Sequence, residues 1–284
     1  MPLKGSSMEE INCPCCGAEQ SSFWAEETGF AVVRCDDCGL LFVNPRPSQD
    51  HIGEAVATGT HRLGNKILNV RSRRIPSKIK HYQKQLRPIL QDVIDLGKPV
   101  TWVDVGSGYG EFIEALSGIL PKGSVIKGVE PMKHKADDAI SRGLDIHHGF
   151  LQPEQFEADF ISNIDVFSHI ADYHDFLKTV VSNLSSGGEY IMETGNLADV
   201  KQRTEFPVEL GLPDHLVFGG KDHFQRYFSA AGLEMVSCAE IRFDTAMQMF
   251  KNAVKIILGR NSYVGIPYTS PYRQLIMRAR RSDA

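Results

Sequence analysis

The sequence Val103-Asp104-Val105-Gly106-Ser107-Gly108-Tyr109-Gly110 decides the fold of this chain. An apolar run that begins at residue 100 leads into it, and a helical pattern of apolar residues follows it. Glycine tolerates positive φ and has no Cβ to hold a ligand away from the backbone. The stretch therefore predicts a strand, a sharp turn and a helix that together hold a nucleotide-type cofactor. Taken alone, it is also compatible with a tight turn that binds nothing.

A second apolar segment, residues 125–129, ends at Glu130. An acid at the end of the second strand of a doubly wound sheet is placed to accept two hydrogen bonds from ribose hydroxyls. The glycine spacing is Gly-x-Gly-x-Gly, which is shorter than the Gly-x-Gly-x-x-Gly of dinucleotide-binding sites. The shorter turn suits a cofactor that has no pyrophosphate to bind.

The motif Asp-x-Gly-x-Gly-x-Gly, followed by the strand-terminal glutamate, resembles that of the class I S-adenosylmethionine-dependent methyltransferases. This resemblance implies an α/β, Rossmann-like domain with a seven-stranded, mostly parallel sheet, helices on both faces and strand seven inserted antiparallel. It also implies that Asp104 binds the amino acid part of the cofactor, and that Phe150 and Leu151 lie where the adenine ring would bind. The predicted cofactor contacts are Asp104, Gly106, Ser107, Gly108, Gly110, Glu130, Pro131, Met132, Phe150, Leu151, Asn163 and Asp165.

Five of the six cysteines lie between Cys13 and Cys38. The pairs Cys13-x-x-Cys16 and Cys35-x-x-Cys38 are separated by residues 17–34, a spacing typical of a four-cysteine zinc site. Four thiolates complete the tetrahedral coordination of zinc, so the predicted zinc ion is structural. Cys15 is a possible substitute ligand, although its spacing to a partner would then be wrong. A set of unrelated thiols is the alternative.

Residues 11–47 are predicted to form a zinc ribbon, and a module of this size needs its metal in order to fold. The segment CDDCGLLFVNPRPS, residues 35–48, resembles the segment that precedes the methyltransferase domain in many bacterial enzymes of polysaccharide and secondary-metabolite pathways. We assign residues 48–97 to a linker and helical cap, and residues 98–284 to the methyltransferase domain. Within the cap, we expect a loop over residues 50–65 and helical pieces over residues 66–96, interrupted by Pro76 and Pro88.

The composition is that of an ordinary globular protein, with 42% hydrophobic and 23% charged residues among 284. No apolar run approaches the roughly 20 residues that span a bilayer, and residues 1–10 lack the apolar core of a signal peptide. We therefore expect a cytoplasmic protein. The tail, residues 278–281, is predicted to be a solvated end.

Basic residues gather between residues 71 and 87. A solvated helix face is the default interpretation of such charges, and binding of an anionic substrate is the sharper one. The formal net charge of −4 gives the whole chain no attraction to nucleic acid. The basic residues in question are Arg71, Arg73, Arg74, Lys78, Lys80, Lys84 and Arg87.

Methyl transfer to an oxygen nucleophile needs a base. His215 is the first candidate, because a neutral imidazole accepts a hydroxyl proton near pH 7. It lies in residues 197–219, which are expected to form a loop over the site, and Asp214 either orients it or is itself the base. His169, just after the fourth strand, is the second candidate. A histidine that only holds its loop through a backbone carbonyl is the alternative for His169.

The leading interpretation is a methyltransferase with S-adenosylmethionine and structural zinc as cofactors. Its predicted acceptor is a small molecule such as an anionic sugar or nucleotide-sugar, and its oligomeric state is open. The chain also resembles the sugar C-methyltransferases of deoxysugar pathways, but those are longer and carry a Glu-His pair that is not found here, which favours O-methylation. RNA methylation is a second interpretation, disfavoured by the net charge and by the lack of aromatic residues among the basic ones. A non-catalytic scaffold is the third, disfavoured by the intact glycine turn and Glu130.

Overall fold

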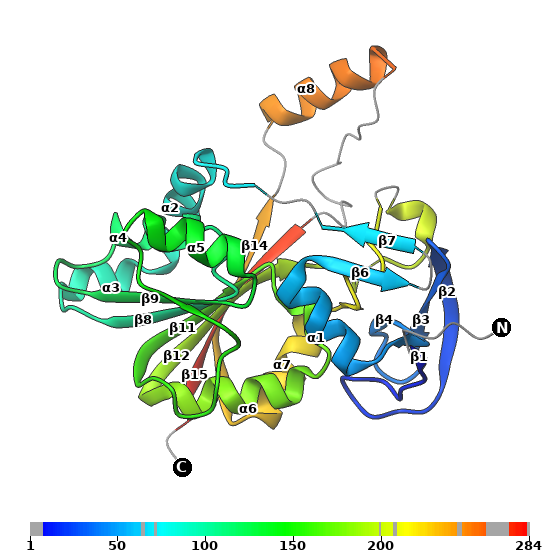
Figure 1. Ribbon diagram of the computed structural model, residues 1–284, viewed down its shortest axis with the longest axis horizontal. Helices are drawn as coiled ribbons and strands as arrows, with labels where there is room; N and C mark the ends of the chain where they lie inside the picture. The colour runs from blue at the N-terminus through cyan, green and yellow to red at the C-terminus, as the bar shows by residue number, and fades with distance from the viewer. Residues whose placement is uncertain are drawn as a thin grey trace.

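A twisted seven-stranded sheet forms the centre of the computed structural model, which describes residues 8–63, 66–70, 73–198, 200–206, 209–242, 246–259 and 273–282 (Figure 1). The strand order is β10-β9-β8-β11-β12-β15-β14. The first five strands are parallel, and β15 is antiparallel to both of its neighbours, so the predicted antiparallel insertion is confirmed. The bounds are β8 Thr101–Val105, β9 Val125–Glu130, β10 Ile146–His148, β11 Ala158–Ile164, β12 Leu184–Gly195, β14 Leu233–Arg242 and β15 Arg273–Arg281.

Helices cover both faces of this sheet because successive strand residues point to opposite sides. On one face, Val103 and Tyr190 pack with Tyr227, in a core shared with α6 and α7. On the other face, Trp102 and Ile191 belong to a second core with α2, α3 and α4. The bounds of these helices, with α5 and two 3-10 turns, are α2 Ser77–Ile89, α3 Gln91–Leu96, α4 Glu111–Ser117, α5 Lys133–Ser141, η1 Phe167–His169, α6 Tyr173–Asn183, η2 Arg203–Glu205 and α7 Lys221–Ala230.

The cysteine-rich module shares a sheet with the rest of the chain. Its strands β2 Ser21–Glu27, β3 Phe30–Cys35 and β4 Leu41–Val43 form an antiparallel sheet, which is completed by β13 Val217–Phe218. A short pair of β1 Met8–Glu9 with β5 Arg46–Pro47 closes the module. Residues 197–219, expected to be a loop, therefore also contribute a strand and hold the module against the main sheet.

The segment before the main sheet is more regular than expected. Helix α1 spans Gln49–Thr58 and is followed by the hairpin of β6 Thr60–Leu63 and β7 Lys66–Asn69, so the predicted loop over residues 50–65 is wrong. The helix forms because His51, Ile52 and Ala55 are buried on one side of it, and Gly59 ends it in the left-handed conformation. The helical pieces predicted over residues 66–96 begin only at α2, because residues 66–69 form strand β7.

The C-terminal strand contradicts the prediction of a solvated end. Arg278 is only 5% exposed, and its guanidinium bonds Glu189 at 2.7 Å and Asp92 at 2.8 Å. A buried cation is tolerated because two carboxylates compensate it.

Helix α8, Ala246–Ile257, follows β14 and precedes β15 in the chain, and it stands away from the sheet (Figure 1). None of the helices in the described segments has both the length and the apolar composition that a membrane span requires.

Candidate functional site

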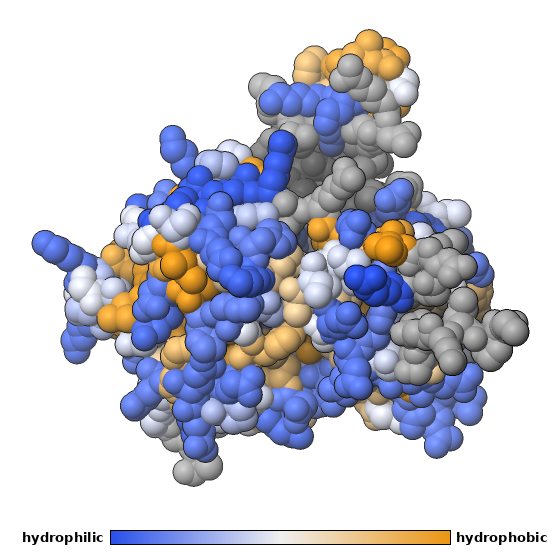
Figure 2. Space-filling model, viewed as in Figure 1, coloured by the Kyte–Doolittle hydropathy of each residue, from blue (hydrophilic) through white to orange (hydrophobic). Residues whose placement is uncertain are grey.

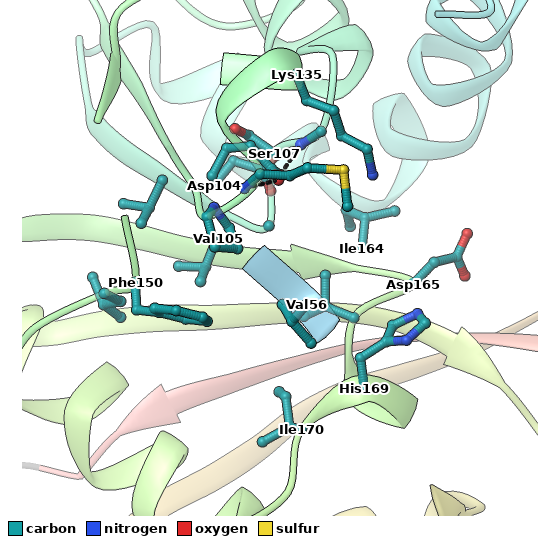
Figure 3. A pocket seen from close by; sticks show the side chains of 18 of the residues that line it. Val56, Asp104, Val105, Ser107, Lys135, Phe150, Ile164, Asp165, His169 and Ile170 are labelled. Atoms are coloured by element: carbon teal, nitrogen blue, oxygen red, sulfur yellow. Dashed lines mark hydrogen bonds between the residues drawn. The ribbon is translucent and has the colours of Figure 1, made fainter. Parts of the chain in front are cut away.

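A cavity of about 530 Å³ lies at the carboxyl ends of β8, β9 and β11. Open α/β sheets bind ligands at this edge. The cavity wall includes Asp104 and Phe150, and also His169 just beyond β11, and α1 contributes Ile52 and Val56 (Figure 3). The cavity therefore joins the predicted cofactor side to one of the two predicted basic histidines.

The glycine turn after β8 has the predicted left-handed backbone. Gly106, Gly108 and Gly110 have φ of 75°, 57° and 83°. A Cβ on Gly108 would meet no atom within 4 Å, and Gly108 lines the cavity. A Cβ on Gly106 would lie 2.5 Å from Val166, and one on Gly110 would lie 2.3 Å from Leu144. Gly108 thus leaves open space in the cavity, whereas the other two glycines permit close packing.

The carboxylate of Glu130 fixes this turn. One oxygen accepts the Gly108 N–H at 2.7 Å, and the other accepts the Met132 N–H at 2.8 Å. Glu130 is buried yet lines the cavity together with Pro131 and Met132. Carboxylate oxygens have further lone pairs, so Glu130 retains capacity to bind ribose hydroxyls.

Asp104 sits in a buried hydrogen-bond chain below the turn. Ser162 donates its hydroxyl to Asp104 Oδ1 at 2.6 Å and accepts the Trp102 Nε1–H at 2.9 Å. Burial raises the pKa of Asp104 to about 7, the Ser162 hydrogen bond opposes the rise, and the charge of Glu130 adds to it. A neighbouring cation would oppose this rise in the pKa of Asp104, because it would favour the charged form of the carboxyl.

Two predicted cofactor residues lie outside the cavity wall. Successive residues of β11 point to opposite faces of the sheet, so Asn163 lies on the face opposite to Ser162. Asn163 is fully buried there, and its Oδ1 accepts a hydrogen bond from the Tyr190 hydroxyl at 2.6 Å. Gly110 serves the packing of Leu144 instead. The predicted residues that line the cavity are Asp104, Gly106, Ser107, Gly108, Glu130, Pro131, Met132, Phe150, Leu151 and Asp165.

His169 and Asp214 form the wall opposite the glycine turn. His169 Nδ1 lies 2.8 Å from the backbone oxygen of Asp214, so this nitrogen carries the proton and Nε2 keeps a free lone pair. The Asp214 carboxylate lies 3.1 Å from His61 Nε2. Burial lowers the pKa of His169, but the hydrogen bond and charge of Asp214 outweigh burial and raise it above its usual value. His169 is thus a proton acceptor whose basicity Asp214 increases.

His215, the first candidate base, is absent from the residues that line the cavity. Its Nδ1 lies 2.7 Å from the backbone oxygen of Leu210. Burial and the neighbouring His169 lower the pKa of His215 below its usual value. His169, Asp214 and His215 each place one ligand atom within 4.8 Å of the others, but Nδ1 of both histidines already faces a backbone oxygen. Of the two histidines predicted as bases, His169 lines the cavity and His215 does not.

Only some of the basic residues between residues 71 and 87 line the cavity. Arg73 and Lys78 line the cavity, whereas Arg74 binds the carboxylate of Glu114 at 2.7 Å. Lys135 of α5 also lines the cavity, and Figure 3 shows its side chain extending along it. Arg71 lies outside the described residues, and Lys80, Lys84 and Arg87 are exposed on α2.

Sequence reasoning missed several residues of the cavity. Ile52 and Val56 belong to a helix that was expected to be a loop, and Tyr82 was predicted only to lie in the helical pieces over residues 66–96. A single lysine does not indicate a cavity residue, so Lys135 could not be identified from the sequence. His61 had no sequence signal, because its contact with Asp214 joins residues far apart in the chain.

The four predicted metal ligands come together. Cys13 Sγ lies 3.5 Å from Cys38 Sγ, and Cys16 Sγ lies 3.6 Å from Cys35 Sγ. Tetrahedral zinc with bonds of about 2.3 Å would separate its sulfur atoms by about 3.8 Å, so the cluster fits such an ion. Cys15 is buried against the backbone oxygen of His223 and is not part of the cluster.

A family model described as a methyltransferase domain matches residues 78–238. No curated protein is significantly similar to the chain in sequence.

Several solved structures share the fold. A geranyl diphosphate C-methyltransferase from Streptomyces coelicolor A3(2), in complex with Mg²⁺, geranyl diphosphate and S-adenosyl-L-homocysteine, is 16% identical with a TM-score of 0.53. The match covers 73% of this chain and 84% of that one. A putative sarcosine dimethylglycine methyltransferase from Galdieria sulphuraria is 14% identical with a TM-score of 0.54, covering 72% and 86%. The 4+2 cyclase SpnF is 16% identical with a TM-score of 0.50, covering 70% and 81%.

Proposed function

Since the chain belongs to the methyltransferase domain family, we propose that this S-adenosylmethionine-dependent methyltransferase acts on a hydroxyl of a sugar, nucleotide-sugar or glycan. One observation carries the proposal: a single cavity joins the glycine turn and Glu130 to His169. Such a cavity brings two reactants together, and positioning the reactants is much of what an in-line methyl transfer requires.

The residues of the glycine turn fit the cofactor. Gly108 leaves space where any side chain would enter the cavity, Glu130 would bind the ribose, and Asp104 would face the amino acid part. Phe150, which is 48% exposed and lines the cavity, offers an apolar surface for the adenine ring. The bound cofactor supplies an electrophilic methyl group on a sulfonium.

His169 is the proposed general base. Its Nδ1–H is donated to the backbone of Asp214, which leaves Nε2 to accept the proton of the acceptor hydroxyl. Asp214 stabilises the imidazolium that results, and His61 holds the Asp214 carboxylate from the other side. Asp214 and His61 are positioning residues in this scheme, because they act through His169.

Arg73 and Lys78 favour an acceptor that carries a phosphate group. The same two cations are also able to bind the carboxylate of the cofactor, and kinetics separate the two roles. If they bind the acceptor, Arg73→Gln and Lys78→Gln raise the KM of the acceptor and leave the affinity for S-adenosylhomocysteine unchanged. If they bind the cofactor, that affinity falls instead.

Calorimetric titration with S-adenosylhomocysteine tests the cofactor site. We expect binding by the wild-type protein, weakened by Asp104→Ala and Glu130→Gln. A screen of nucleotide-sugars with labelled S-adenosylmethionine then tests the acceptor class. Failure of the wild type to bind would contradict catalysis and favour the scaffold interpretation. Binding without transfer to any sugar, but with salt-sensitive retention of RNA, would favour RNA as the acceptor.

We also propose that Cys13, Cys16, Cys35 and Cys38 bind a structural zinc ion, supported by their sulfur spacing. The ion would fix the module on which β13 pairs, and so hold residues 214–218 in place. Zinc analysis of Cys35→Ser, with Cys238→Ser as the matched control, tests the site. We expect loss of zinc and of thermal stability only in Cys35→Ser. Equal zinc content in both variants would contradict it.

A further inference from the structure

Helix α8 turns its apolar face away from the protein. Phe250 is 67% exposed, Ile257 is 83% exposed and Leu258, just past the helix, is 66% exposed. Together with Val254 these residues have the i, i+4, i+7, i+8 spacing of one helix face. Asn252, on the opposite side, is 6% exposed. Ile256, four residues after Asn252, is 47% exposed, so exposed apolar surface extends beyond the stripe, but the stripe contains the most exposed apolar side chains of the helix.

The position of α8 makes this stripe accessible to a flat surface. Figure 1 shows the helix standing off from the central sheet, beyond the ends of β14 and β15. Figure 2 shows apolar side chains gathered along its outer edge. A contiguous apolar patch at a protruding position indicates an interaction site.

The charges of α8 select the partner. Exposed Lys251 and Lys255 flank the stripe, and residues 246–259 contain no acidic residue, although the whole chain has a net charge of −4. A second copy docked face to face would bring these lysines against the same lysines, with no acid on the helix to pair with them. An anionic lipid surface instead offers acyl chains to the stripe and phosphates to the lysines.

We propose that α8 docks on an anionic lipid surface, where Phe250, Val254, Ile257 and Leu258 enter the boundary between headgroups and acyl chains. Lys251 and Lys255 contact the headgroup phosphates. The helix lies in the plane of the surface, as amphipathic interfacial helices do. This docking depends on α8 alone and is independent of the methyl-transfer proposal.

Flotation of the full-length, zinc-replete protein with vesicles tests the proposal. We expect binding to vesicles that contain phosphatidylglycerol, weaker binding to pure phosphatidylcholine, and release by 0.5 M salt. Phe250→Ser with Ile257→Ser should abolish binding, and Lys251→Gln with Lys255→Gln should weaken it roughly fivefold per lysine. Leu96→Ser is the matched control, because Leu96 is 69% exposed at the end of α3 and should not affect binding.

The variants change exposed side chains, so equal thermal melting profiles are expected and are checked first. Absence of binding to phosphatidylglycerol vesicles would overturn the proposal. Equal loss of binding in Leu96→Ser would also overturn it, because the effect would then not be specific to α8. A dimer seen by light scattering that dissociates in Phe250→Ser with Ile257→Ser would identify a second copy as the occupant, against the proposal.

Discussion

The two sides of the cavity are built by different means. The proposed cofactor side comes from residues 104–109 and 129–132, which are two strand ends and their turns. The proposed acceptor side depends on His169 and Asp214, and on His61, which contacts Asp214 from a third segment. A local motif therefore specifies the cofactor side, whereas tertiary packing specifies the acceptor side. Mutations should separate the two sides by affecting cofactor affinity or turnover independently.

The largest expected effect is the loss of the base. His169→Gln should lower kcat by roughly 10²–10⁴-fold, the usual contribution of a general base, while the affinity for S-adenosylhomocysteine stays unchanged. His215→Gln is the comparison variant, and it should lower kcat far less because His215 does not line the cavity. Steady-state kinetics at saturating cofactor measure both. A larger loss of kcat in His215→Gln than in His169→Gln would instead support His215 as the base, which is the first candidate from the sequence.

The next effect tests the cofactor side. Gly108→Ala adds a methyl group in open cavity space and forces alanine to φ near 57°, a conformation that costs roughly 1–2 kcal/mol. We expect its affinity for S-adenosylhomocysteine to fall at least about tenfold, or 1.4 kcal/mol. Gly143→Ala is the matched control, because Gly143 has φ of 86° and open space but lies outside the cavity wall. Calorimetry that shows equal affinity losses in both variants would attribute the loss to backbone strain.

The contrast between local motifs and tertiary packing also explains which parts of the structure can be predicted from the sequence. Alternating apolar segments and glycine turns are local, so the strands of the sheet and the glycine turn could be predicted from the residues. The antiparallel insertion was implied only by the resemblance to a known family. Helix α1 could not, because Gly53 and several polar residues weaken a helical pattern that tertiary burial stabilises. Arg278 was misassigned because its partners Glu189 and Asp92 lie far from it in the sequence. The place of Asn163 against Tyr190 could not be predicted, because a motif does not reveal which face of β11 a residue occupies.

A smaller effect should follow from cutting the hydrogen-bond chain beneath the turn. Ser162→Ala removes the donor to Asp104 and the acceptor of the Trp102 Nε1–H, which should lower the free energy of unfolding by about 1–3 kcal/mol. The pKa of Asp104 should rise further above about 7, because the Ser162 hydrogen bond now holds it down. Affinity for the ammonium of S-adenosylhomocysteine should therefore weaken at pH 7 and recover at higher pH.

Ser117→Ala is the control for Ser162→Ala, because the Ser117 hydroxyl donates only to the backbone of Ile113 within α4. Denaturant unfolding and calorimetry at several pH values measure the two consequences. A pH-independent loss of affinity in Ser162→Ala would show that Asp104 does not titrate in this range.

The smallest effect concerns the basicity of His169. Burial lowers the pKa of His169, and Asp214 raises it by more, so the neutral form that accepts a proton appears only above a raised pKa. Asp214→Asn removes the charge and should shift the acid limb of the kcat profile to lower pH. Asp175→Asn, which removes another acid of the cavity wall without touching His169, should leave the limb in place. An unshifted limb in Asp214→Asn would mean that a group other than His169 controls it, and the acceptor side would then have to be reassigned.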